Sequence, residues 1–130
     1  MSIDPRFYEA IETFNRRAFF QAHQIWESVW LPYRGPSRDL MKGLIQIALG
    51  LHHFTNGNTR GARKLYVSCQ KYLNGYRPQH LGVDVERFLT DVHACCAELS
   101  SCPDETPETC LDPRLIPRIR YQAPVTGQRP

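Results

Sequence analysis

His23 and Glu27 are four residues apart, a spacing that places an imidazole and a carboxylate side by side on one face of a helix. At about 100° per residue, Phe19, Trp26 and Trp30 fall within about 60° of His23 on the same helix. Two ionisable groups therefore lie within an aromatic stripe. Because burial without partners would cost several kcal/mol, neighbouring elements must supply polar partners.

The next apolar segment of the chain carries a matching polar row. Lys42, Gln46 and His53 fall within about 40° of one line along a helix. Short connections make consecutive helices antiparallel neighbours, so the two rows are expected to meet. The predicted cluster consists of His23, Glu27, Lys42, Gln46 and His53, with Trp26 and Trp30 as its walls.

Three interpretations of this cluster stay open. The first is a structural network in which Glu27 pairs with Lys42, and Gln46 or a backbone carbonyl holds His23. The second is a small-ligand pocket with a polar floor and tryptophan walls. The third is a metal-assisted hydrolase that uses His23, Glu27 and His53.

The metal interpretation is the weakest of the three. Di-metal bundles add a Glu-x-x-His pair on further helices, and the chain lacks one. Lys42 would also repel a cation, so we expect no metal and no cofactor. A non-enzymatic protein is favoured, in which the cluster is either structural or the pocket for a small molecule of unknown identity.

Basic residues gather between positions 58 and 77, where no acidic residue occurs. Such a segment could meet a phosphate backbone or an acidic partner. No nucleic-acid motif accompanies it, so a solvated helix face is favoured over nucleic-acid binding. The residues are Arg60, Arg63, Lys64, Lys71 and Arg77.

The five cysteines form no Cys-x-x-Cys pair, which favours reduced thiols in a cytoplasmic protein over a disulfide framework or a zinc knuckle. A Cys102–Cys110 disulfide is the disfavoured alternative. We expect Cys96 to point inward and Cys95 outward. No apolar leader follows Met1, and no apolar run is long enough to span a membrane. Three other histidines are expected to be solvated: His52, His80 and His93.

Apolar periodicity predicts a single-domain, all-α antiparallel bundle of five helices, over about 4–15, 15–30, 37–55, 59–73 and 84–99. The central helix is expected to be the most buried, with Gly43 and Gly50 on a face that a neighbouring helix approaches closely. We assign 1–100 to the bundle. Six prolines make 101–130 an irregular tail, of which 116–119 can dock on the bundle as an extended segment.

Two sequence blocks resemble a known family. One is FNRRAFFQAHQIWESVW, residues 14–30, and the other is GLIQIAL, residues 43–49, with His52-His53, Asn56-Gly57-Asn58 and Gly61-Ala62-Arg63 after it. Together they resemble the signature of the helical family catalogued as domain of unknown function 309, over about residues 6–75. The resemblance implies a compact helical bundle and no assigned activity.

The resemblance also bears on the predicted cluster. Its signature positions coincide with His23, Glu27, Trp30, Lys42 and Gln46. Family members usually carry glycine where this chain has Arg17, and acidic residues where it has Gln21 and Gln24. Fewer negative charges near His23 weaken the metal interpretation further.

Overall fold

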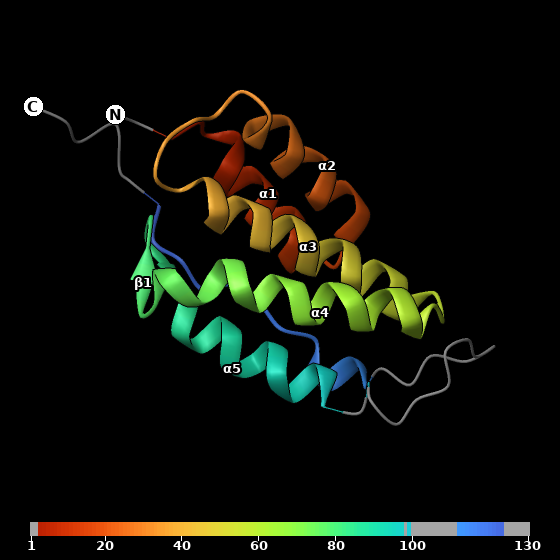
Figure 1. Ribbon diagram of the computed structural model, residues 1–130. Coiled ribbons are helices and arrows are strands. Elements are labelled where there is room, and N and C mark those ends of the chain that lie inside the picture. Colours follow the sequence, from red (N-terminus) through yellow and green to blue (C-terminus); the bar gives the residue numbers. More distant parts are fainter. Residues whose placement is uncertain (1–2, 98, 100–111, 124–130) are drawn as a thin grey trace, which may run out of the picture.

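The computed structural model describes residues 3–97, 99 and 112–123, and this part of the chain is all-α, as predicted. Its five helices stack side by side, with α3 between the α1–α2 pair and α4 (Figure 1). They are α1 (Arg6–Asn15), α2 (Phe19–Trp30), α3 (Arg38–Thr55), α4 (Thr59–Leu73) and α5 (Val85–Cys96). None of these helices is long and apolar enough to cross a membrane.

Short elements join and follow the helices. Two strands of two residues each, β1 (Gln79–His80) and β2 (Val83–Asp84), form an antiparallel hairpin between α4 and α5. Two 3₁₀ turns, η1 (Asn74–Tyr76) and η2 (Pro113–Leu115), complete the described elements. The hairpin was not predicted, since strands of two residues are too short to show an alternating pattern.

The centre of the bundle is α3, which contributes ten buried residues, more than any other helix described. Helix α4 packs, as expected, on the face of α3 that carries Gly43 and Gly50. A Cβ atom at Gly43 would lie 2.7 Å from Cγ of Leu73, and one at Gly50 would lie 3.2 Å from Cβ of Leu65. The two glycines therefore set how closely α3 and α4 approach each other.

The turn that follows α1 contains a residue with left-handed backbone. Arg17 has φ 67°, and the amide of Ala18 donates to the carbonyl of Thr13 across the turn, at 3.1 Å. Glycine is the usual residue at such a helix end, because a Cβ atom crowds the backbone there. Members of the family that the sequence resembles usually carry glycine at this position.

Replacing Arg17 by glycine should raise the free energy of unfolding by about 1 kcal/mol, the cost of a left-handed residue with a side chain. The matched control is Arg16→Gly, because Arg16 has φ −85° and gains nothing from the change. Urea unfolding measures both variants. Equal effects of the two substitutions would contradict the left-handed turn.

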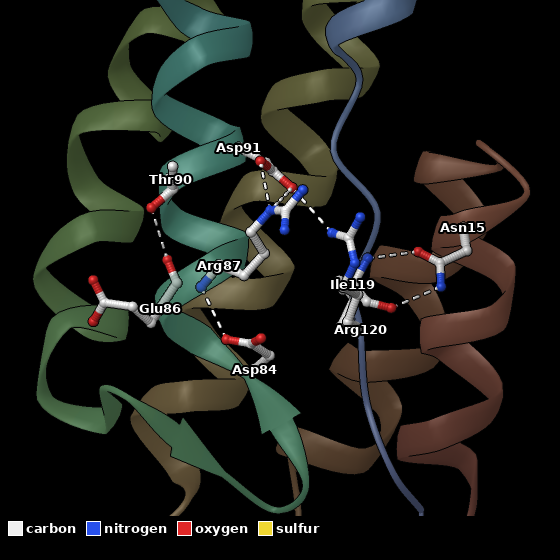
Figure 2. Close-up of polar contacts among 8 residues, drawn as sticks. All are labelled: Asn15, Asp84, Glu86, Arg87, Thr90, Asp91, Ile119 and Arg120. Atoms are coloured by element: carbon white, nitrogen blue, oxygen red, sulfur yellow. Dashed lines mark hydrogen bonds and ion pairs between the residues drawn. The ribbon is translucent and has the colours of Figure 1, made fainter.

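The C-terminal segment 116–123 crosses from the end of α5 to the hairpin, between α5 and α1 (Figure 2). Asn15 of α1 bonds both backbone groups of Ile119: its Nδ2 donates to the carbonyl at 3.0 Å, and its Oδ1 accepts from the amide at 2.8 Å. The amide of Asp84 donates to the carbonyl of Arg120 at 2.9 Å. Residues 116–119 thus dock on the bundle as predicted, and hydrogen bonds hold the segment there. Cys102 and Cys110, with most of 101–130, lie outside the described residues.

The solvent-exposure predictions are wrong for Cys95, which is buried, and for His52 and His80, which are half-buried; His93 is exposed, as predicted. Cys95 is buried like Cys96 and Cys69, and all three are free thiols. His80 Nε2 lies 2.7 Å from Oγ of Ser37. His93, although exposed, has its Nδ1 2.6 Å from the hydroxyl oxygen of Tyr66. These partners lie 27 or more residues away in the sequence, so local spacing gave no sign of them.

Candidate functional site

At one end of the α2–α3 pair, Phe20 packs against two histidine rings. Its ring centroid lies 4.8 Å from that of His23 and 5.0 Å from that of His52. The rings of His52 and His53 are 5.8 Å apart. Phe20 is 43% exposed, so these side chains border solvent. We call Phe20, His23, His52 and His53 the histidine group.

A backbone carbonyl determines the tautomer of His23 in the histidine group. The backbone carbonyl of Phe20 lies 2.7 Å from Nδ1 of His23. Because a carbonyl only accepts, the neutral ring carries its proton on Nδ1 and keeps a lone pair on Nε2. Burial, with the nearby charges of His52 and His23, lowers the pKa of His53. The lowered pKa favours the neutral form of His53, in which one ring nitrogen can accept a hydrogen bond.

At the other end of the α2–α3 pair, two cations lie over the indole of Trp30. Cζ of Arg38 is 4.1 Å from the ring centroid, and Nζ of Lys42 is 4.6 Å from it. The negative face of the ring attracts both cations. We call Trp30, Arg38, Lys42 and Gln46 the tryptophan group.

Two buried atoms of the tryptophan group have no hydrogen-bond partner among the described residues: Nε1 of Trp30, a donor, and Oε1 of Gln46, an acceptor. Orphaned buried polar atoms are uncommon, and each costs about 1–3 kcal/mol. Within the described ranges, no carboxylate forms an ion pair with Arg38 or Lys42 either. The tryptophan group thus combines two cations with an orphaned donor and an orphaned acceptor.

Two side chains expected in the cluster point elsewhere. Glu27 is exposed, and in the described part of the chain it forms no hydrogen bond or ion pair. The expected Glu27–Lys42 pair is absent because Lys42 lies over Trp30. Trp26, expected as a wall, is fully buried against α1, where its Nε1 donates to the carbonyl of Phe7 at 3.1 Å.

Three side chains of the two groups were not predicted to take part: Phe20, Arg38 and His52. Arg38 had a sequence signal, because it precedes Lys42 by four residues and so shares its helix face. Phe20 and His52 meet only across two helices, and no spacing within one helix reveals such a contact.

Neither of the two surface cavities described borders the predicted cluster. One, of about 460 Å³, is lined by residues of α1 and α2 and the turn that joins them; the other, of about 250 Å³, lies along α5 and the C-terminal segment. In residues 3–97, 99 and 112–123, no three His, Cys, Asp or Glu side chains are placed to hold a metal ion. His23, Glu27 and His53 are accordingly not gathered as a ligand set.

The basic face of α4 is only partly free to meet a partner. Its exposed cations are Arg60, Lys64 and Lys71. Arg63 is half-buried and donates from Nε to the carbonyl of Leu99 at 3.0 Å, so the prediction of an exposed side chain is wrong there. Arg77, beyond the helix, forms an ion pair of 3.0 Å with Glu86.

Comparison with known proteins supports the resemblance seen in the sequence. The family model described as Domain of unknown function (DUF309) matches residues 7–65, which run from α1 to the first half of α4 and include the five residues of the predicted cluster and both of its tryptophans. No curated protein matches the chain. The predicted resemblance is confirmed: residues 7–65 of this chain match the model of the DUF309 family.

Proposed function

We propose that this domain is a non-enzymatic binding module, and that a small hydroxy acid or amino acid binds at the tryptophan group. The observation that carries the proposal is the pair of orphaned buried atoms in a group with two cations, for which the described part of the chain provides no carboxylate partner. The carboxylate of the ligand would accept from Lys42 and from Nε1 of Trp30. Its hydroxyl or ammonium group would donate to Oε1 of Gln46, one helical turn from Lys42.

The ligand would enter by displacing a flexible side chain. Lys42 is half-buried over the indole, and no hydrogen bond or ion pair from the described residues holds its ammonium group, so it can swing toward an anion at low cost. Glu27, three residues before Trp30, would form the solvent-exposed rim of the site. His23 and His53 lie two helical turns from Trp30 and Gln46 respectively, at the other end of the α2–α3 pair, and would stay outside it. The free thiols of the described cysteines support a cytoplasmic setting for this function.

The test is a thermal-shift screen with a panel of small hydroxy acids and amino acids. A member present at a hundredfold excess over its Kd stabilises the folded protein by about 2.7 kcal/mol. We expect that shift in the parent and in Lys71→Met, a control that removes an exposed lysine of α4. It should be lost in Lys42→Met and weakened in Gln46→Leu.

Two results would contradict the proposal. One is that no panel member stabilises the parent. The other is that Lys42→Met keeps the full shift. If Gln46 is kept for structure, Gln46→Leu should lower the free energy of unfolding without any ligand. If it is kept for binding, the same change should be neutral or stabilising, because it removes an orphaned buried carbonyl. Urea unfolding of that variant without ligand distinguishes the structural role from the binding role.

A further inference from the structure

Four arginines line the cavity of about 250 Å³ between α5 and the C-terminal segment. This groove lies on other elements than the tryptophan group. Its polar lining comes from Arg87 and Asp91 of α5, beside Ala94, from Arg114 of η2, and from Arg118 and Arg120 of the C-terminal segment.

The positions of these side chains follow from the backbone of α5 and of the C-terminal segment. On α5, the spacing of 87, 91 and 94 puts three side chains on one helix face, and the small Ala94 leaves room between them. In the extended segment, Pro117 and Ile119 are buried while Arg118 and Arg120 are exposed. The hydrogen bonds of Asn15 with Ile119, drawn in Figure 2, hold this alternation in register.

The groove holds more positive than negative charge. Asp91 accepts from Arg87 Nε at 3.2 Å and from Arg120 Nη1 at 3.2 Å (Figure 2), and Asp112 accepts from Arg114. Each of these arginines keeps N–H groups beyond those bonds, since a guanidinium has five.

The fourth arginine of the groove, Arg118, has neither a hydrogen bond nor an ion pair within the described part of the chain. Four guanidinium groups therefore face two carboxylates. The excess matches the charge of one phosphoryl group, about −1.5 to −2 at neutral pH.

We propose that this groove binds the phosphoryl group of a small phosphorylated molecule, with Arg118 as its principal ligand and Arg87 and Arg120 beside it. Guanidinium groups bind phosphate oxygens through paired N–H bonds, which a planar fork provides and a lysine does not. Asp91 orients two of the arginines and leaves their outer N–H groups directed at the groove. A cavity of this volume accommodates a phosphate or diphosphate group rather than a large ligand.

Titration calorimetry with pyrophosphate, at constant ionic strength, tests the groove. Arg118→Gln should weaken binding at least tenfold and leave the thermal midpoint unchanged, because Arg118 has no partner to lose in the described structure. Arg60→Gln is the matched control: it removes the same charge from an exposed site on α4 and should change the affinity less than twofold. Lys42→Met should also bind pyrophosphate as the parent does, which separates this proposal from that for the tryptophan group.

Absence of saturable pyrophosphate binding by the parent would overturn the proposal. Equal losses in Arg118→Gln and Arg60→Gln would overturn it as well, because they would indicate attraction to net charge alone. A ten-nucleotide single strand without terminal phosphates serves as a further probe. If it binds more tightly than pyrophosphate and both variants weaken it alike, the protein binds polyanions over a broad surface and the groove is not a phosphoryl site.

Discussion

Replacing Gly43 by valine should lower the free energy of unfolding by about 2–3 kcal/mol, because α4 leaves no room for a side chain there. A Cβ atom at this position would lie 2.7 Å from Cγ and 2.8 Å from Cδ2 of Leu73, and 3.2 Å from Cβ of Tyr72. Leu73 is fully buried and cannot swing into solvent. The two methyl groups of valine would therefore push α3 and α4 apart.

Urea unfolding of three glycine variants would measure this effect. Gly50→Ala should cost less than Gly43→Val, because its nearest neighbour, Cβ of Leu65, would lie 3.2 Å away. Gly75→Ala is the control: nothing lies within 4 Å of its added carbon, and its effect should stay within about 0.5 kcal/mol. A Gly43→Val protein as stable as the parent would show that α4 does not pack on this face of α3.

Local signals in the sequence predicted the helices well. Asn58 accepts a hydrogen bond from the amide of Gly61 at the start of α4, and Asp84 accepts one from the amide of Arg87 at the start of α5. Asn and Asp are the residue types expected at such N-caps, and an apolar stripe follows each of them. An N-cap and an apolar stripe each involve residues that are close together in the sequence. Both can therefore be recognised within one segment.

The orientation of side chains about α2 could not be predicted in the same way. Helical spacing groups His23, Trp26 and Trp30, but it does not say which flank of the stripe α1 covers. Trp26 packs against Phe7 and Phe14 of α1, whereas Trp30 lies under the cations of α3. The single cluster that was predicted is therefore two groups, at opposite ends of the α2–α3 pair.

The groove of arginines depends on contacts that are still more remote in sequence. Asn15 and Ile119 are 104 residues apart, and the exposed side of the C-terminal segment follows from their pairing. Arg118 and Arg120 face α5 only in that register, because a shift by one residue would turn them toward the core. The sequence indicated an extended segment but contained no sign of where the segment docks.

Replacing Asn15 by alanine should lower the free energy of unfolding by about 2 kcal/mol, because it leaves a half-buried amide and carbonyl of Ile119 without partners. Ile119 itself is 1% exposed, so its side chain anchors the segment that Asn15 aligns. Urea unfolding gives the energy, and hydrogen exchange of the Ile119 amide shows whether the segment is released. That amide should exchange slowly in the parent and fast in the variant.

Arg17→Gln is the control for the Asn15 variant, because Arg17 also reaches the C-terminal segment but through one exposed hydrogen bond, from Nη2 to the carbonyl of Pro113 at 3.1 Å. Its cost should stay within about 0.5 kcal/mol. The Asn15→Ala protein should also bind pyrophosphate more weakly, since Arg118 and Arg120 lose their fixed backbone. Should Asn15→Ala leave both stability and Ile119 exchange unchanged, the other contacts of the segment suffice to hold it, among them the hydrogen bond from the amide of Asp84 to the carbonyl of Arg120. Loosening of the segment without any loss of pyrophosphate affinity would place the phosphoryl site outside the groove.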